Sequence, residues 1–317
     1  EASFFKNRLG FDVTLYDVKT TDLIIPLPVD PATGYGFTRI NAGEMTNKGV
    51  EAMLNVTPVK TSDFTWDMSW NFTKNNNKLV ELQDDLQNYI LTNAPFRVQL
   101  AAQVGYSYGV ILGTDFVYDA NGNKVVGSNG YYKASAIKPL GSVLPDYNMG
   151  LRNTLKYKNL SMSFLFDMQQ GGKYFSTSHM FGMYSGMLEE SALGGNREAG
   201  VVLAGVKENG QPNDILLDAA TWGASYYNTV DAQNVFDASY IKLRDLTIGY
   251  DLPKSIIGNT LQGVRVSFFG RNLLAWNLAF KGIDPENTSY GSGNIQGLEG
   301  GSLPSTRTYG FNVNFKF

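Results

Sequence analysis

The sequence predicts an all-β fold, a transmembrane antiparallel up-and-down β-barrel to which this chain contributes about eight strands. Three observations predict it: segments in which apolar and polar residues alternate, charges confined to the polar positions, and connections that are alternately short and long. The alternation is clearest at residues 309–317, where aromatic or aliphatic side chains occupy every second position and the chain ends on Phe317. A period of two is that of a strand with one apolar face.

Eight segments show this period, and most approach the ~9–11 residues with which a tilted strand crosses a bilayer. The segments are residues 11–15, 50–56, 64–72, 149–157, 160–168, 240–250, 264–268 and 309–317. In the sixth segment the apolar residues change parity near Asp245, which predicts either a β-bulge or the edge of the membrane.

Charged residues within these segments lie almost entirely on the polar parity, and only Asp17, at a strand end, lies on the apolar one. Six of them are predicted to line the water-filled side of the wall: Glu51, Asp67, Arg152, Lys156, Arg265 and Arg271. A charge facing lipid near the midplane costs about 2–4 kcal/mol, so a barrel needs this partition. A soluble sandwich needs it too, so parity alone leaves sandwich or propeller folds open.

The connections favour the barrel. Short turns at residues 60–63, 158–159 and 253–263 alternate with long excursions at 26–46, 74–145, 171–238 and 278–304. Outer-membrane barrels combine short periplasmic turns with long extracellular loops, whereas four long structureless loops at one end are rare in soluble domains.

Composition narrows the function classes. A net charge of -3 argues against a nucleic-acid partner, and the absence of cysteine excludes disulfides and thiolate metal sites. No apolar run reaches the ~18 residues of a membrane helix, so insertion into a membrane would require closed β-structure. We expect neither a metal nor an organic cofactor.

Several ordered motifs make the chain similar to the C-terminal part of the SusC/RagA-like TonB-dependent transporters of Bacteroidetes outer membranes. They lie at residues 47–51, 71–80, 145–150, 169–172, 240–250, 270–276 and 282–286. The resemblance implies a 22-stranded barrel with an N-terminal plug. It also implies import driven by TonB, a SusD-like surface lipoprotein as partner, and oligomeric glycans or peptides as cargo.

The sequence departs from that family pattern by omission. It contains no plug and no TonB box, so we expect residues 1–317 to form a C-terminal part of the barrel domain, with the plug and the remaining strands supplied by the rest of the transporter. The alternative is a free-standing eight-stranded outer-membrane barrel with a structural or adhesive role, because eight strands can close.

No arrangement of residues predicts catalysis. His179 is the only histidine and is interpreted as packed or solvated. Residues 119–123 are interpreted as a hairpin turn rather than a calcium loop, and Asp284-Pro285-Glu286 as a turn stiffened by proline. Aromatic residues of the long loops are the candidates for contact with cargo, since their rings could stack on sugars or peptides. They are Tyr106, Tyr108, Tyr131, Tyr132, Trp222, Tyr226 and Tyr227.

Overall fold

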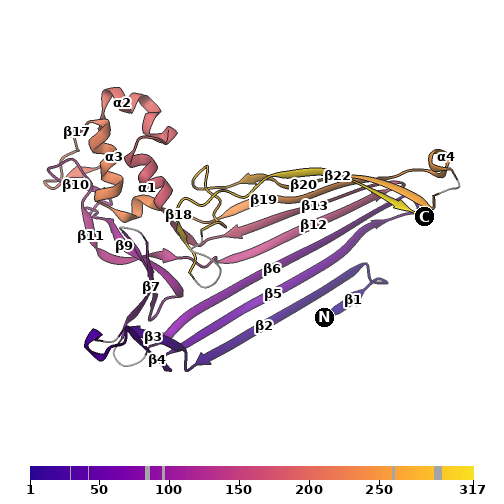
Figure 1. Cartoon of the computed structure of the whole chain (residues 1–317), viewed down its shortest axis with the longest axis horizontal. Helices are drawn as coiled ribbons and strands as arrows, with labels where there is room; N and C mark the ends of the chain where they lie inside the picture. Colours follow the sequence, from indigo (N-terminus) through magenta and orange to yellow (C-terminus); the bar gives the residue numbers. More distant parts are fainter. Residues whose placement is uncertain (29, 42, 83–85, 95–96, 259–260, 289–294) are drawn as a thin grey trace.

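The structure is a computed structural model that describes residues 1–317 except 29, 42, 83–85, 95–96, 259–260 and 289–294. Its main element is one sheet of long strands in chain order, each antiparallel to the next (Figure 1). After the short β1 (Ala2–Phe4), these strands, which we call the wall, are β2 (Leu9–Thr21), β5 (Glu44–Lys60), β6 (Phe64–Glu81), β12 (Tyr147–Tyr157), β13 (Leu160–Gln170), β19 (Tyr240–Asp251), β20 (Gly263–Trp276) and β22 (Thr308–Lys316).

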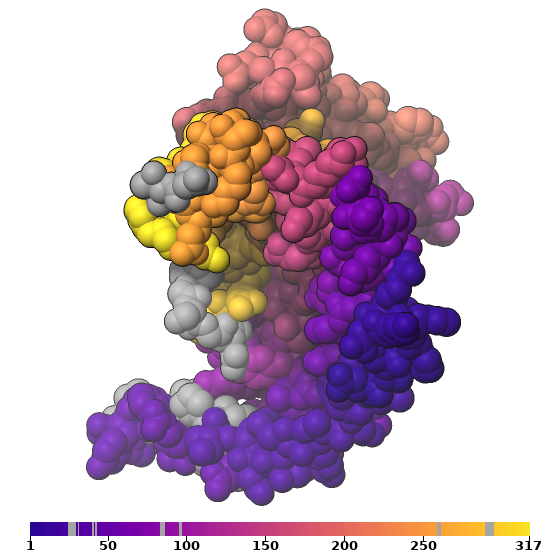
Figure 2. Space-filling view, turned by 90° about the vertical axis from the view of Figure 1, so that its right-hand side faces the viewer, coloured from indigo at the N-terminus to yellow at the C-terminus, as the bar shows by residue number. Residues whose placement is uncertain are grey.

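This meander confirms the predicted up-and-down arrangement, and each of the eight predicted segments corresponds to one strand of the wall, with Phe317 just beyond the end of β22. The short turns and α4 (Lys254–Ile257) lie at one end of the wall and the long excursions at the other (Figure 1). Viewed along the strands, the wall curves as an arc (Figure 2). Among the described residues, β2 and β22 do not pair with each other, so the eight strands do not close into the small barrel of the alternative hypothesis.

The apolar parity of the wall is not covered by a second sheet. Phe164 is paired with Asn153 and Leu246, and side chains paired in this way share one face. Along the same parity, Phe11, Tyr250 and Phe311 keep 42%, 44% and 76% of their surface exposed. None of the buried hydrophobic clusters found among the described residues includes Trp66, Phe164 or Phe268. The wall therefore presents an uncovered apolar band, as a lipid-facing surface requires.

The sixth segment contains the predicted irregularity. The pairings of β19 with β13 and with β20 both shift register between Leu243 and Asp245. Against β13, Arg244 is an extra residue, whereas on the β20 side Asn272 and Leu273 lie opposite it. A bulge of this kind redirects a side chain. The bulge prediction is confirmed, and it accounts for the change of apolar parity.

The long excursions contain more structure than expected. We call residues 82–146, 171–239 and 277–307, so far as they are described, the loop cap. The elements of the cap are β7 (Asn88–Asn93), β8 (Gln99–Gln103), β9 (Tyr108–Phe116), β10 (Val125–Val126), β11 (Ala134–Ser142), β14 (Lys173–Ser176), α1 (Thr177–Tyr184), η2 (Glu189–Gly195), α2 (Asn196–Ala199), β15 (Val201–Val202), β16 (Val206–Lys207), β17 (Leu216–Leu217), α3 (Ala219–Asn228), η3 (Asp231–Asn234), β18 (Val235–Asp237) and β21 (Leu298–Glu299). The first excursion adds β3 (Ile24–Pro28), η1 (Pro31–Thr33) and β4 (Phe37–Asn41).

The expectation of structureless loops is thus wrong, and the reason is local. The two longer helices of the cap, α1 and α3, begin at side-chain caps: Ser176 accepts a hydrogen bond from the backbone N–H of His179, and Asp218 accepts one from that of Thr221. The elements are short, so periodicity does not reveal them. Among the described residues, no helix is long and apolar enough to cross a membrane.

Candidate functional site

The six charged residues predicted to line the lumen all lie on one face of the wall. Register places Glu51 beside Thr73, Lys156 beside Thr65 and Arg271 beside Asp245, all on the parity opposite to Phe164. Paired residues of an antiparallel sheet project from the same side, so these charges share one face. That face is mostly polar, although Met53, Leu165 and Phe269 also lie on it.

Three of these six residues have polar partners along the face. A guanidinium nitrogen of Arg265 lies 2.9 Å from Oδ2 of Asp251. Arg152 approaches Asp245 to 3.5 Å, and Asp67 accepts a hydrogen bond from the hydroxyl of Thr57 at 2.7 Å. These groups are partly solvent-exposed, so each contact contributes little to stability but keeps the face hydrated.

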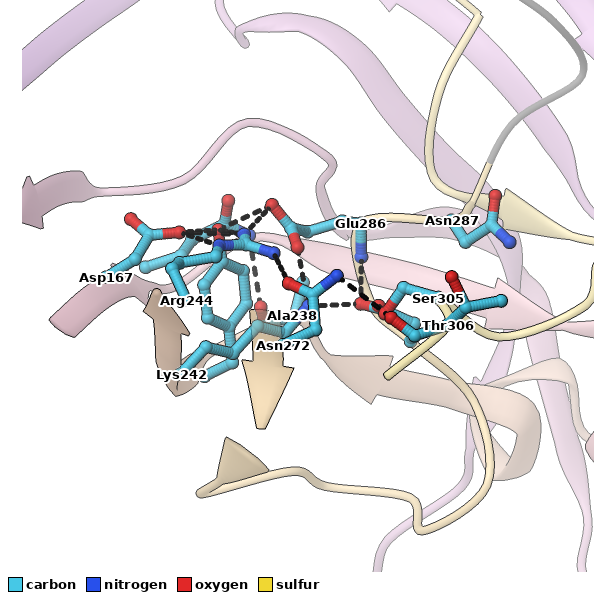
Figure 3. Close-up of polar contacts among 12 residues, drawn as sticks. Asp167, Ala238, Lys242, Arg244, Asn272, Glu286, Asn287, Ser305 and Thr306 are labelled. Carbon is cyan, nitrogen blue, oxygen red and sulfur yellow. Dashed lines mark hydrogen bonds and ion pairs between the residues drawn. The ribbon is translucent and has the colours of Figure 1, made fainter. Parts of the chain in front are cut away.

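A partly buried group of charges joins this polar face to the loop cap (Figure 3). Nζ of Lys242, whose side chain is only 5% exposed, lies 2.5 Å from both Oδ1 of Asp284 and Oε2 of Glu286. Arg244, the bulged residue, donates to Asp167 at 2.7 Å and also pairs with Glu286. We call these five side chains the charge network. It ties β13 and β19 to the excursion between β20 and β22.

Neutral groups complete the charge network. The hydroxyl of Tyr240 donates to Glu286 at 3.0 Å, and that of Ser305 donates to Asp284. Asn272 accepts from Arg244 at 3.3 Å and donates to the backbone carbonyl of Thr306 at 3.2 Å. The excursion is therefore held at residues 284–286 and again at 305–306.

Asp284 and Glu286, the carboxylates that the excursion contributes to the charge network, are stabilised in their ionised form. Burial alone would raise the pKa of Asp284, but hydrogen bonds from Lys242 and Ser305 outweigh it and the pKa is lowered. The pKa of Glu286 is also lowered, because hydrogen bonds from Arg244 and Lys242 exceed the same opposing effect of burial. The arrangement is a charge-paired anchor for the cap.

Sequence reasoning did not bring the two halves of the charge network together. Asp284-Pro285-Glu286 was interpreted as a stiff turn, and the structure adds that both acids are ion-paired. The sequence did contain one indication. Lys242 and Arg244 lie close to the change of parity, and two cations near one face of a strand require carboxylate partners if they are buried. Asp284 and Glu286 lie 42 and 44 residues after Lys242 in the sequence, so no local pattern connects them with it.

Four of the seven aromatic candidates lie together in the cap. Tyr131, Tyr132 and Tyr226 pack around a buried cluster that contains Trp222. Trp222 is 7% exposed, and the hydroxyl of Tyr132 donates to the carbonyl of Ala204 at 3.0 Å. These rings form much of the core of the cap, so any contact with cargo would use only the parts of the rings that line a cavity.

The remaining candidates are dispersed. Tyr106 is 46% exposed, near the turn that joins β8 to β9. Tyr108 lines a cavity of about 460 Å³ together with Asn75 and Asn77, while Tyr227 packs against a separate buried cluster. The sequence did not indicate which of the seven aromatic residues would gather in the cap.

The two other sequence motifs behave as interpreted. His179 is packed and 2% exposed, with Nδ1 2.9 Å from Oδ1 of Asn234. Residues 119–123 form a turn closed by a backbone hydrogen bond of 2.9 Å from the N–H of Asp119 to the carbonyl of Asn123.

Comparison with known proteins gives the relatives of this fold. The chain is 31% identical to TonB-dependent receptor P3 of Formosa agariphila, with all of the chain and 33% of that protein aligned. It is 26% identical to TonB-dependent receptor SusC of Bacteroides thetaiotaomicron, across 99% of the chain and 31% of that protein. The solved structure of the RagAB peptide transporter superposes on 99% of the chain and 34% of that chain, with a TM-score of 0.74 and 23% identity.

The chain spans about a third of the length of these relatives. A family model described as TonB dependent receptor-like, beta-barrel matches residues 1–273, which include the wall from β2 to β19 and most of β20. Proteins of this family are outer-membrane proteins, and the exposed apolar band agrees with that location. The chain belongs to the TonB-dependent receptor-like β-barrel family.

Proposed function

We propose that this chain forms part of the wall of an outer-membrane importer that takes up oligomeric nutrients with energy delivered by TonB. The observation that carries the proposal is the two-sided wall, with an uncovered apolar band on one face and a mostly polar face that holds the charges on the other. A water-filled path along the polar face requires a barrel of more than the eight strands of this chain, because a closed barrel of eight strands is filled by its own side chains.

The proposal assigns the missing parts to the rest of the protein. Further strands pair with β22 at one edge and with β1 and the unpaired remainder of β2 at the other, and a plug occupies the lumen. We propose a wall of 22 strands, in which Glu51, Asp67, Arg152, Lys156, Arg265 and Arg271 face the water-filled path. The charge network holds the excursion between β20 and β22 against that path.

A SusD-like surface lipoprotein is the proposed partner. In support, the similarity to SusC extends over 99% of this chain. The loop cap is also folded and lies at one end of the wall (Figure 1). Cargo would be enclosed between the lipoprotein and the cap, and the aromatic residues of the cap would contact it. The proposed cargo is an oligosaccharide or an oligopeptide. RagAB, a structural neighbour, is described as a peptide transporter.

Uptake by cells tests the proposal. Cells that lack the gene are complemented with the wild-type protein, with Lys242→Met, or with Lys281→Met, which removes an exposed charge in the same excursion. Each strain receives fluorescent glycan and peptide oligomers, with and without a functional TonB. We expect TonB-dependent accumulation of at least one oligomer, weaker accumulation with Lys242→Met, and no change with Lys281→Met.

Accumulation that is unaffected by deletion of the gene, for every oligomer supplied, would contradict import. Accumulation that depends on the gene but persists without TonB would contradict the proposed energy source. Surface display of each variant is measured in parallel, so that loss of the protein is not mistaken for loss of transport.

A further inference from the structure

The loop cap contains a second cavity, of about 350 Å³, which is open to solvent. Its aromatic walls come from elements far apart in the sequence, namely β9, the segment before β11, α3 and β18. Those walls are Phe116, Tyr132, Trp222, Tyr226 and Phe236, and the polar groups that line the cavity are Lys124, His179, Glu190 and Gln233. A largely apolar concave site with a few converging polar groups is the usual form of a small-ligand site.

Lys124 is the unusual member of this lining. Its ammonium group lies 3.5 Å from the centroid of the Phe116 ring and 5.1 Å from that of Tyr132. Among the described residues it has neither an ion pair nor a hydrogen-bond acceptor, although an ammonium offers three donors. The carboxylate that acts on it, Asp115, is held by Lys138 at 2.8 Å.

The environment makes this cation a good partner for an anion. Burial lowers the pKa of Lys124, and the charge of Asp115 only partly opposes that effect. The ring faces of Phe116 and Tyr132 offer partial compensation for the lost hydration. An oxyanion that entered the cavity would supply the acceptors that the ammonium lacks, in a site with less screening than bulk water.

Glu190 limits what the ligand can be. Its carboxylate lies 3.3 Å from Nε2 of His179, and its side chain remains 48% exposed. Burial, followed by the charge of Glu190, raises the pKa of Tyr226, so the Tyr226 phenol stays neutral. A second anion beside Glu190 would be repelled, whereas hydroxyl or amide groups would donate to it. The lining thus suits a ligand that carries one carboxylate and several hydrogen-bond donors.

We propose that the cavity beside Lys124 binds a carboxylate-bearing terminal unit of the cargo. Two sources have this chemistry: a uronic acid residue of an oligosaccharide, whose ring would lie against the aromatic walls, and the C-terminal residue of a peptide. The inference rests on the proposed import function, because it names the group by which cargo is first held. The cap would then select acidic oligomers before they reach the lumen.

Equilibrium binding to the purified full-length transporter tests this without any uptake step. Isothermal titration calorimetry compares a trisaccharide whose only acidic unit is one terminal uronic acid with its methyl ester, and a tripeptide with its C-terminal amide. We expect one of the two acids to bind at least about tenfold more tightly than its neutral counterpart, and Lys124→Met to remove that difference. Lys124→Arg should retain most of it. Lys133→Met, which breaks an exposed ion pair with Glu208, is the matched control and should leave binding unchanged.

Equal affinity of both acids and their neutral counterparts would overturn the inference, as would a preference for the acid that survives Lys124→Met. The thermal unfolding of each variant is recorded, and the ester titration shows that the cavity remains intact in Lys124→Met. A transporter that binds the acid through Lys124 but imports nothing would contradict the import proposal and leave this site standing, so the two failures are distinguishable.

Discussion

The wall and the loop cap use apolar side chains in opposite ways. In the wall, the apolar residues of the edge strands β2 and β22 are in large part exposed, and hydrogen bonds between strands hold the sheet. In the cap, Phe175, Met180 and Leu298 are almost fully buried in a core of their own. A water-soluble fold buries its apolar residues, so the cap behaves as a small soluble domain on a wall whose solvent is lipid.

The comparison predicts that the two regions lose stability through different substitutions. The largest effect is expected in the core of the cap. Trp222→Ala removes a ring that is 7% exposed and should destabilise the cap by about 3–5 kcal/mol, through lost burial and a residual cavity. Hydrogen exchange followed by mass spectrometry should show faster exchange in α1 and α3 and unchanged exchange in β12 and β13.

Tyr106→Ala, at a side chain that is 46% exposed, is the matched control and should change exchange little. Equal loss of protection in wall and cap after Trp222→Ala would mean that the two regions do not have separate cores.

The next effect concerns the lipid-facing parity. Phe164→Arg places a charge near the centre of β13 on the apolar face and should cost about 2–4 kcal/mol in folding into vesicles. Ser163→Arg, one position earlier, lies on the polar face and should cost far less. Denaturant titration in lipid vesicles measures both, and equal costs would argue against a lipid-facing band.

The junction between the regions should respond to pH. Because the pKa values of Asp284 and Glu286 are lowered in the folded protein, their contribution to docking is fully present above their ordinary values of 3.8 and 4.5. It is lost as the pH falls through the lower folded values. A spin label at Ser302, in the same excursion, should therefore keep constant mobility from about pH 5 to 8 and become more mobile in stronger acid.

Asp284→Asn should increase the mobility of that label already at neutral pH, because Lys242 then lies buried with only one carboxylate. If the mobility of the label changed between pH 5 and 8, groups other than Asp284 and Glu286 would hold the excursion. A label that stays immobile in strong acid would show that the charges do not hold it.

The smallest effect concerns a polar pair on the apolar parity of the wall. The indole N–H of Trp66 donates to Oδ1 of Asn153 at 3.0 Å. Hydrogen bonds in a membrane setting contribute about 0.6 kcal/mol, so Trp66→Phe should destabilise the wall by roughly that amount. Trp70→Phe is the control, since its indole has no hydrogen bond among the described residues. Equal changes in the vesicle titration would remove Asn153 from the explanation.

The contrast between the regions also explains what the sequence could predict. Alternation at residues 160–168 identifies β13, because each strand of the wall has one face toward lipid and one toward water. Apolar and polar residues therefore alternate with a period of two. The bulge at Arg244 was visible in the sequence as a change in the parity of the apolar residues. The predicted polar parity of Arg152 and Arg265 followed from the same rule.

The sequence of the cap shows no comparable periodicity. Its helices are as short as α2, with four residues, and its core joins residues such as Val126 and Trp222 that are far apart in the sequence. The charge network required the same kind of distant contact between Lys242 and Asp284. Asn153, on the otherwise apolar parity of β12, was hidden because one polar residue does not break a period.

Site-directed spin labelling along β13 tests most directly whether the wall lies between lipid and water. The chain contains no cysteine, so single cysteines at positions 161–168 can each carry a label in the full-length protein once cysteines elsewhere are replaced. In vesicles, we expect labels at 162, 164, 166 and 168 to be relaxed by oxygen dissolved in lipid and labels at 161, 163, 165 and 167 by a water-soluble nickel complex. Labels of both parities that respond alike, or position 164 shielded from both reagents, would contradict a membrane wall.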